Sequence, residues 1–209
     1  MSRQYADTEL TETESRTWER DRDYLCGRGL IVDLGCGPGR FMEMLKQRSD
    51  PFYGVDMERA SVETCRRQGF KVERMDALRH LRSRKKGVLG GIHCYSLIEH
   101  IPKEHVEEFL GHCFRTLKKG GRLVLGTANG NRIDTVVGGF WDDFQHVRPY
   151  TALLLRHLAE EQGFEVDFSG GDELTRKQSL ARKLLRKIRT VLVGPYYGPP
   201  GIVLLARKP

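Results

Sequence analysis

Residues 31–40 read Ile-Val-Asp-Leu-Gly-Cys-Gly-Pro-Gly-Arg, and this stretch decides the fold. A short apolar run that includes Asp33 is followed by glycines at alternate positions and then by a segment of helical character. The order predicts a buried strand that delivers Asp33 to a tight loop. Gly35, Gly37 and Gly39 let the backbone adopt positive φ and approach a ligand closely. The N–H groups of the loop and of the next helix then face an anionic group such as a carboxylate.

Two kinds of ligand-binding loop share parts of this pattern. A dinucleotide-binding loop requires Gly-x-Gly-x-x-Gly and an acid about 20 residues later, and Asp56 lies near that distance. Arg40 stands where the third glycine is required, however, and Pro38 removes a loop N–H. Asp33 instead suits a ligand that carries a cationic ammonium group beside its carboxylate. A strand, turn and helix without any ligand is the third interpretation.

With Asp56 at the end of the next apolar segment, the stretch resembles the motif of class I S-adenosylmethionine-dependent methyltransferases. The resemblance extends over residues 28–169. Two further segments carry it: residues 92–102, which contain Glu-His-Ile-Pro, and residues 117–123, Leu-Lys-Lys-Gly-Gly-Arg-Leu. It implies S-adenosyl-L-methionine as the cofactor, and the ammonium and carboxylate would then be those of its methionine moiety.

The resemblance also implies roles for the residues that end the predicted strands. Asp56 would accept hydrogen bonds from both ribose hydroxyls, a task that suits a carboxylate, and Met57 would lie against the adenine. Asp76 would lie near the adenine amino group, although it also fits the N-cap of a helix, and the two roles are compatible. The implied cofactor-binding residues are Asp33, Gly35, Cys36, Gly37, Gly39, Asp56, Met57, Asp76, Ala77, Tyr95 and Ser96.

Apolar segments of strand length alternate along the chain with segments of helical character. Strands are predicted at residues 29–34, 51–55, 70–74, 91–95, 122–126, 164–168 and 202–206. Helices are predicted at residues 40–47, 60–68, 103–118 and 150–162, the third ended by Gly120 and Gly121. The alternation predicts an α/β fold with a doubly wound, mostly parallel seven-stranded sheet in three α/β/α layers. The resemblance implies an antiparallel last strand, and ligands of such sheets bind at the carboxyl ends of the strands.

Residues 1–209 are predicted to form a single methyltransferase domain, because this length suffices for one α/β core. Residues 1–27 are predicted to form a helical cap, with a helix from about residue 8 to residue 24 and with Tyr5, Trp18 and Tyr24 as candidate anchors. This helix either covers the ligand site or is loosely held. Residues 28–169 form the core, residues 170–200 an insertion and residues 201–207 the last strand.

Residues 129–150, which we call the acceptor loop, are predicted to bind the methyl acceptor. The loop contains His-Val-Arg-Pro at 146–149, which resembles a stretch of bacterial methyltransferases associated with surface glycans, lipids and related metabolites. An oxygen acceptor benefits from a general base, and His146 is the first candidate for it, followed by His100. A phosphate or carboxylate acceptor would need none. The alternative for the loop is a packed connection in which Trp141 and Phe144 belong to the core.

The five cysteines are scattered and form no Cys-x-x-Cys pair, which excludes a disulfide framework and a structural zinc site and indicates a reducing cytoplasm. His100, His105 and His112 lie close in sequence, but a spacing of five does not align two side chains on one helix face. No metal is therefore expected. Neither a signal peptide nor an apolar run of ~18 residues, the length of a membrane span, is evident.

The net charge of +7 is concentrated at the end of the chain, where residues 174–209 hold nine Lys or Arg and no acid. Residues 175–193 combine leucines at helical spacing with basic residues and predict a basic amphipathic helix. Three interpretations stay open: docking on an anionic membrane surface, binding of nucleic acid, and an ordinary helix with a solvated basic face.

These features predict a cytoplasmic S-adenosylmethionine-dependent methyltransferase, with a peripheral position at the inner membrane surface as an option. The predicted acceptor is a small molecule or a glycan or lipid precursor, methylated on oxygen. The alternatives are an RNA methyltransferase that uses the basic helix and a non-catalytic cofactor-binding scaffold. The intact glycine loop with Asp56 argues against the scaffold.

Overall fold

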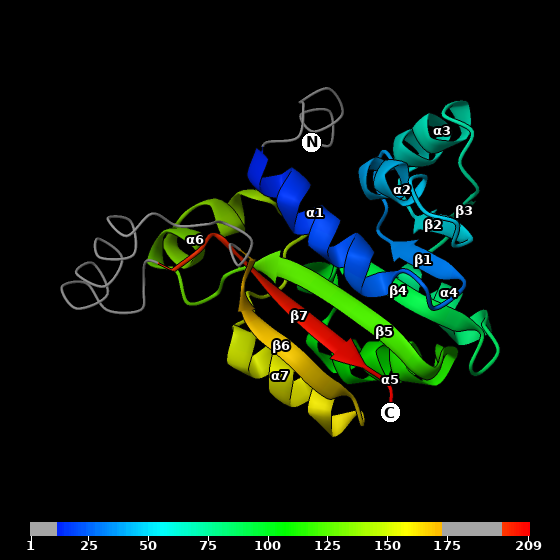
Figure 1. Ribbon diagram of the computed structural model, residues 1–209. Helices are drawn as coiled ribbons and strands as arrows, with labels where there is room; N and C mark the ends of the chain where they lie inside the picture. The colour runs from blue at the N-terminus through cyan, green and yellow to red at the C-terminus, as the bar shows by residue number, and fades with distance from the viewer. Residues whose placement is uncertain (1–11, 173–197) are drawn as a thin grey trace.

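The computed structural model describes residues 12–172 and 198–209, and a seven-stranded sheet lies at its centre (Figure 1). The strand order is β3-β2-β1-β4-β5-β7-β6. The strands are β1 (Ile31–Leu34), β2 (Phe52–Asp56), β3 (Val72–Arg74), β4 (Leu89–Tyr95), β5 (Leu117–Ala128), β6 (Glu165–Gly171) and β7 (Gly201–Arg207). Strands β1 to β5 are parallel, and β7 runs antiparallel to both β5 and β6. The predicted mostly parallel sheet with an antiparallel last strand is confirmed.

Helices cover both faces of this sheet and complete the three predicted layers (Figure 1). They are α1 (Glu12–Leu25), α2 (Arg40–Leu45), α3 (Arg59–Arg67), α4 (Ala77–Ser83), α5 (Val106–Thr116), α6 (Ile133–Val137) and α7 (Ala152–Glu161), with 3-10 turns η2 (Ile98–His100), η3 (Lys103–His105) and η4 (Gly139–Asp142). Successive strand residues point to opposite faces. Ile31 packs with Leu25 of α1 and Phe41 of α2, whereas Val32 belongs to the larger cluster that includes Phe109 of α5.

Helix α1 is anchored on the sheet, so the interpretation of a loosely held helix is wrong for its described residues. Leu25 is fully buried. The ring of Trp18 meets that of Phe41 edge-on at 6.5 Å, and the hydroxyl of Tyr24 donates a hydrogen bond to Asp167 at 2.7 Å. Trp18 and Tyr24, two of the three candidate anchors, therefore make contacts that join the helix to other elements, and the third, Tyr5, lies outside the described residues.

Two local expectations differ from the structure, and a third concerns residues that the structure does not describe. Helix α5 ends at Thr116 and not at the glycine pair, because Leu117 is extended and pairs with Leu89 of β4. Gly120, with a φ of +72°, instead lies inside β5 and donates its N–H to the carbonyl of Lys208. Helices α4 and α6 are additional to the predicted set. The predicted insertion at 170–200 falls mainly on residues 173–197, and its basic helix lies outside the described residues.

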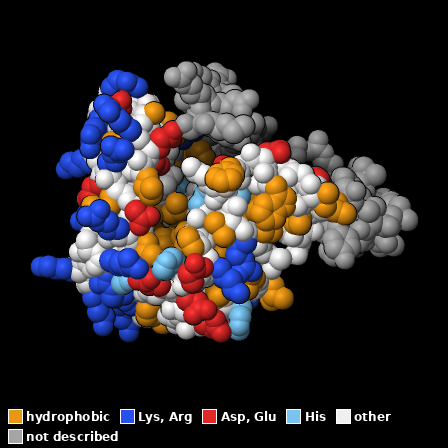
Figure 2. Space-filling view, turned by 180° about the vertical axis from the view of Figure 1, so that it is seen from behind, with side chains coloured by type: hydrophobic (Ala, Val, Ile, Leu, Met, Phe, Trp, Pro, Cys, Tyr) orange, Lys and Arg blue, Asp and Glu red, His pale blue; other side chains and the backbone are white. Residues whose placement is uncertain are grey.

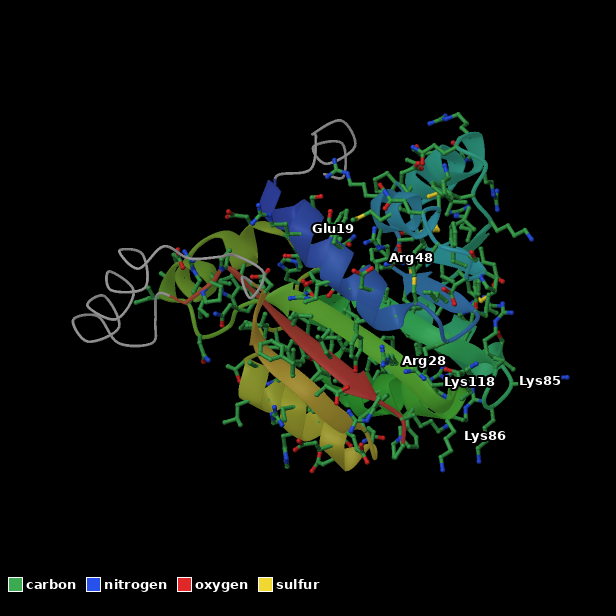
Figure 3. All side chains as sticks on the ribbon, in the orientation of Figure 1. Glu19, Arg28, Arg48, Lys85, Lys86 and Lys118 are labelled. Atoms are coloured by element: carbon green, nitrogen blue, oxygen red, sulfur yellow. The ribbon has the colours of Figure 1, made fainter. Side chains whose placement is uncertain are left out.

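Charge is distributed unevenly over the described residues as well. Figure 2 shows Lys and Arg gathered at the side of the molecule opposite α6. Arg28, Lys85, Lys86 and Lys118 are exposed where β1, β4 and β5 begin, as Figure 3 shows. This basic edge is remote from the carboxyl ends of the strands, where ligands of such sheets bind. Within residues 12–172 and 198–209, no helix is both long and apolar enough to cross a membrane.

Candidate functional site

The glycine loop lies between β1 and α2, where the strand order reverses between β1 and β4. The N–H groups of Gly35 and Cys36 both reach the carbonyl of Val55 in β2, at 2.8 and 3.2 Å. Gly35, Gly37 and Gly39 have φ values of +70°, +52° and +89°, which confirms the predicted need for glycine. At Gly39 an added Cβ would also lie 3.1 Å from Cys65 Sγ.

Asp56 lies directly beside this loop. One carboxylate oxygen accepts the N–H of Gly37 and the other accepts the N–H of Glu58, each at 2.8 Å. Burial raises the pKa of Asp56, and the two backbone hydrogen bonds oppose that shift. Each oxygen of an ionised carboxylate has a second acceptor position. The pair of backbone donors therefore orients the carboxylate and leaves it able to accept two further hydrogen bonds.

Asp33 is 3% exposed and lies beneath the loop. Its Oδ1 atom accepts a hydrogen bond from Nδ1 of His93 in β4 at 2.7 Å, while its Oδ2 atom is buried without a hydrogen-bond partner in the described structure. His93 was not among the predicted site residues, because its contact with Asp33 joins two strands across 60 positions of sequence. An unpartnered buried carboxylate oxygen is a fitting acceptor for an ammonium group.

Helix α1 packs against β4, the strand that carries His93. Asp21 is fully buried and pairs with Arg20 at 2.6 Å, and Arg20 also reaches the hydroxyl of Tyr95 at 3.5 Å. Burial raises the pKa of Asp21 and raises that of Tyr95 well above its usual range. The Tyr95 ring lies against Gly126, and only glycine fits there because an added Cβ would lie 2.2 Å from the ring.

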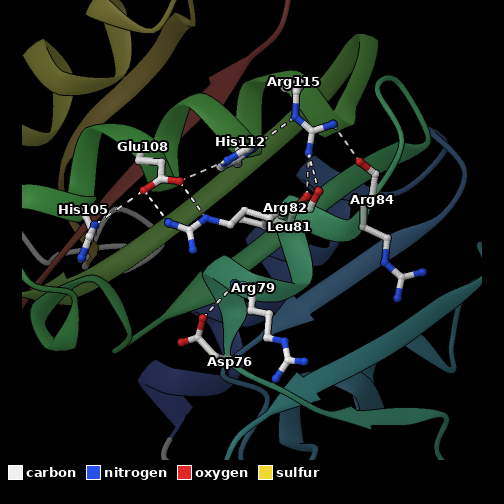
Figure 4. Close-up of polar contacts among 9 residues, drawn as sticks. All are labelled: Asp76, Arg79, Leu81, Arg82, Arg84, His105, Glu108, His112 and Arg115. Carbon is white, nitrogen blue, oxygen red and sulfur yellow. Dashed lines mark hydrogen bonds and ion pairs between the residues drawn. The ribbon is translucent and has the colours of Figure 1, made fainter.

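The remaining predicted cofactor residues also follow carboxyl ends of strands. Asp76 is exposed and caps α4, accepting the N–H of Arg79 at 2.8 Å (Figure 4). The N-cap role predicted as an alternative is confirmed, while its role toward adenine stays a prediction. Ala77 is buried in the first turn of α4, and Met57 is 64% exposed. Ser96 has a φ of +48° and donates its N–H to Gly126 at 2.9 Å.

The acceptor loop brings His146 to His100, with ring centroids 4.7 Å apart. A backbone hydrogen bond from Val147 to the carbonyl of Glu99, at 2.8 Å, holds the loop against η2. His146 stacks on Phe140 and places Nδ1 2.6 Å from the Phe140 carbonyl. A carbonyl only accepts, so Nδ1 carries the proton and Nε2 keeps a free lone pair. The two candidate bases are thus neighbours, although they are 46 positions apart in the sequence.

The exposed and buried aromatic residues of the acceptor loop are not the ones that the alternative of a packed connection predicts. Trp141 is 54% and Phe144 is 99% exposed, so neither belongs to the core and that interpretation is wrong for both. Phe140 and Tyr150 are the buried ones. Glu99, also missed by the sequence analysis, is 2% exposed, and burial raises its pKa.

The family comparison agrees with this geometry. A family model described as "Methyltransferase domain" matches residues 10–167, most of the chain. The chain belongs to this family, and its fold and site define it as a class I S-adenosylmethionine-dependent methyltransferase.

Relatives and solved structures extend the comparison. The chain is 29% identical over 119 residues to a ubiquinone biosynthesis O-methyltransferase of Pseudomonas aeruginosa, over 54% of this chain and 50% of that protein. It thus spans about half the length of the curated relatives it matches. An S-adenosylmethionine-dependent methyltransferase from Archaeoglobus fulgidus superposes with a TM-score of 0.75 at 23% identity, over 94% of each chain. A geranyl diphosphate C-methyltransferase from Streptomyces coelicolor, solved with Mg²⁺, geranyl diphosphate and S-adenosyl-L-homocysteine, gives 0.69 at 17% identity, over 94% of this chain and 79% of that one. Both structures support the fold alone.

Proposed function

We propose that the protein transfers the methyl group of S-adenosyl-L-methionine to an oxygen atom of a small molecule or of a glycan or lipid precursor. The observation that carries this proposal is the carboxylate of Asp56, which the N–H groups of Gly37 and Glu58 orient beside the glycine loop. The name of the Pseudomonas relative supports a small-molecule acceptor and an oxygen target.

The residues of the site fit this cofactor. Asp56 can accept two ribose hydroxyls, and the unpartnered Oδ2 of Asp33 can accept from an ammonium group. The N–H groups of the glycine loop suit a carboxylate. When bound, S-adenosyl-L-methionine supplies a methyl group that its sulfonium already activates. Alignment of the acceptor is then the main task of the protein.

His146 serves as the general base in this proposal. Its Nδ1–H is held by the carbonyl of Phe140, which leaves Nε2 to take the proton of an acceptor hydroxyl. His100 lies next to it and is the second candidate. Phe140 fixes the plane of the His146 ring, and the exposed Trp141 and Phe144 offer apolar surface to the acceptor.

Calorimetry with S-adenosyl-L-methionine, S-adenosyl-L-homocysteine and NAD tests the cofactor. Binding of the two sulfur nucleotides but not of NAD is expected, and no binding of either at millimolar concentration would refute the proposal. Transfer of a labelled methyl group into small-molecule, lipid, glycan and RNA fractions then identifies the acceptor. Label in RNA alone would favour the alternative of an RNA methyltransferase, and no label in any fraction would favour a scaffold. A cytoplasmic location and an anionic membrane partner stay predictions.

A further inference from the structure

Three side chains with metal-ligating atoms converge between η2 and the acceptor loop. His100 ends η2, while Asp143 and His146 follow η4, and one ligand atom from each residue lies within 4.8 Å of the others. Nε2 of His146 is 4.0 Å from Oδ2 of Asp143. Within residues 12–172 and 198–209, no other group of three His, Cys, Asp or Glu side chains lies close enough together to hold a metal ion.

The tautomer of His146 suits a metal ligand. Its Nδ1–H donates to the carbonyl of Phe140 at 2.6 Å, so the lone pair is on Nε2, which faces Asp143. Histidines that bind metal ions almost always donate their other N–H to a carbonyl or carboxylate in this way. The ring of Phe140, itself 3% exposed, stacks on the imidazole with centroids 4.4 Å apart and fixes its orientation.

Two buried polar atoms, one in this group and one in the residue next to it, have no partner in the described structure. They are Nδ1 of His100 and Oε2 of Glu99. Glu99 is 2% exposed and lies within electrostatic range of both histidines. A cation at this position would therefore lie within electrostatic range of the Glu99 carboxyl group as well as beside the carboxylate of Asp143.

A second cluster of histidines around a carboxylate, at η3 and α5, already has a cationic partner (Figure 4). Glu108 lies 3.6 Å from His105 and 3.4 Å from His112, but Arg82 donates to both of its oxygens at 2.7 and 2.8 Å. Arg115 also donates to Nδ1 of His112 at 3.1 Å. A guanidinium thus takes the place that a metal ion would need, and this cluster provides a matched control.

We propose that His100, Asp143 and His146 bind one divalent transition-metal ion of the Zn²⁺ type. Two imidazoles and one carboxylate favour Zn²⁺, Co²⁺ or Ni²⁺ over Mg²⁺ and Ca²⁺. Three protein ligands would leave a further coordination position for water or another ligand, as in catalytic zinc centres. Ligand distances of about 2.0–2.2 Å require the three atoms to close toward the ion. Asp143, whose side chain is 50% exposed, accepts the N–H of Gln145 on Oδ1 at 2.9 Å, so Oδ2, the atom 4.0 Å from Nε2 of His146, is the oxygen offered to the ion. The spacing argument against a metal concerned His100, His105 and His112, which is a different set of residues.

The test is metal titration of the full chain, treated with a chelator and free of any histidine tag. Co²⁺ is followed by its visible absorption and Zn²⁺ by calorimetry, and one ion per chain with micromolar affinity is expected. His146→Ala and His100→Ala should each weaken binding at least ~100-fold, since even outer-shell changes at metal sites cost 10–100-fold. His112→Ala, from the guanidinium-paired cluster, should leave stoichiometry and affinity unchanged.

Binding of S-adenosyl-L-homocysteine by each variant shows that it is folded and separates this site from the cofactor site. Nε2 of His146 has one lone pair and cannot bind an ion and take a proton at the same time, so a bound ion is expected to lower turnover and leave cofactor affinity unchanged. The general-base role belongs to the metal-free chain. Metal binding can therefore fail while the proposed function stands, and methyl transfer can fail while metal binding stands. Absence of Co²⁺ and Zn²⁺ binding by the wild type at millimolar concentration would overturn the proposal. Wild-type affinity in folded His146→Ala, or equal Mg²⁺ and Zn²⁺ affinities, would overturn it as well.

Discussion

The proposed cofactor half, made by the glycine loop and Asp56, and the proposed acceptor half, made by His100 and His146, are assembled in different ways. On the cofactor side, the glycine loop and Asp56 are separated by about 20 residues, and backbone hydrogen bonds join them directly. On the acceptor side, His100 and His146 come from separate elements, and the buried ring of Phe140 and the hydrogen bond from Val147 to Glu99 position them. The first half is built from local backbone geometry and the second from long-range packing. Changes on each side should therefore affect different measured quantities.

The largest expected effect is that of His146→Ala on turnover. Loss of a general base lowers turnover by ~10²-fold or more, while the affinity for S-adenosyl-L-methionine should stay nearly unchanged because Asp56 and the glycine loop are intact. Steady-state turnover and calorimetry measure the two quantities. His157→Ala, at an exposed histidine paired with Glu161 on α7, is the control and should change neither. Normal turnover of His146→Ala would reassign this residue to structure, and so would a loss of folding stability that matches the loss of turnover.

Asp56→Ala should change cofactor affinity more than turnover, the reverse of His146→Ala. Removal of the carboxylate weakens cofactor binding by about 1.5–3 kcal/mol, the scale of lost hydrogen bonds to a charged group. Turnover at saturating cofactor should change much less. Glu63→Ala, which removes an exposed acid from α3, is the control. Equal cofactor affinity of Asp56→Ala and the wild type would break the division between the two halves.

The sequence predicted the strands and the glycine loop well because their signals are local. All seven strands were expected near their observed positions, and the three glycines of the loop have the positive φ that their spacing suggested. The predicted end of α5 was wrong because Leu117 pairs with Leu89 of β4, so the helix ends before it reaches the glycines. Helix α4 had a local signal, since Asp76 is an N-cap residue in front of Ala-Leu-Arg-His-Leu.

The acceptor half was predicted only in outline because its contacts join distant segments. His146 and His100 were both named as candidates, but their proximity depends on how the acceptor loop folds back over η2. Similarly, no local pattern distinguishes the buried Phe140 from the exposed Trp141 and Phe144. The group proposed to bind a metal ion was not predicted for the same reason, since three residues spread over 47 positions leave no spacing motif.

A pair of glycine substitutions tests the difference in packing. At Gly54 in β2, an added Cβ would lie 2.6 Å from Cys36 Sγ, so Gly54→Ala should lower the free energy of unfolding by about 1–3 kcal/mol. At Gly139 in the acceptor loop, the nearest atom would be Asp142 Oδ2 at 3.8 Å. Gly139→Ala should change that free energy by less than about 0.5 kcal/mol. Urea unfolding measures both, and equal effects would show that the two halves are packed alike.

The smallest expected effect is a change in the pH dependence of stability at His80, under the cofactor half. Its ring is fully buried, with Nε2 3.0 Å from the Tyr53 hydroxyl and Nδ1 3.1 Å from Glu73. Burial lowers the pKa of His80 below 6.5, and the nearby Arg84 adds to this shift. A lowered pKa means that the unfolded chain binds a proton before the folded one does. The stabilisation is therefore present above pH 6.5 and is lost as the pH falls through the folded-state pKa.

His80→Gln removes this titration, so its free energy of unfolding should fall less steeply than that of the wild type as the pH drops below 6.5. The comparison uses the slopes against pH and not the absolute values, because the substitution also changes the packing around Tyr53. His157→Gln, at an exposed histidine, serves as the control and should keep the slope of the wild type. Parallel curves for His80→Gln and the wild type would mean that His80 binds its proton equally well in the folded and unfolded chain. The buried ring would then contribute nothing to the pH dependence of the free energy of unfolding.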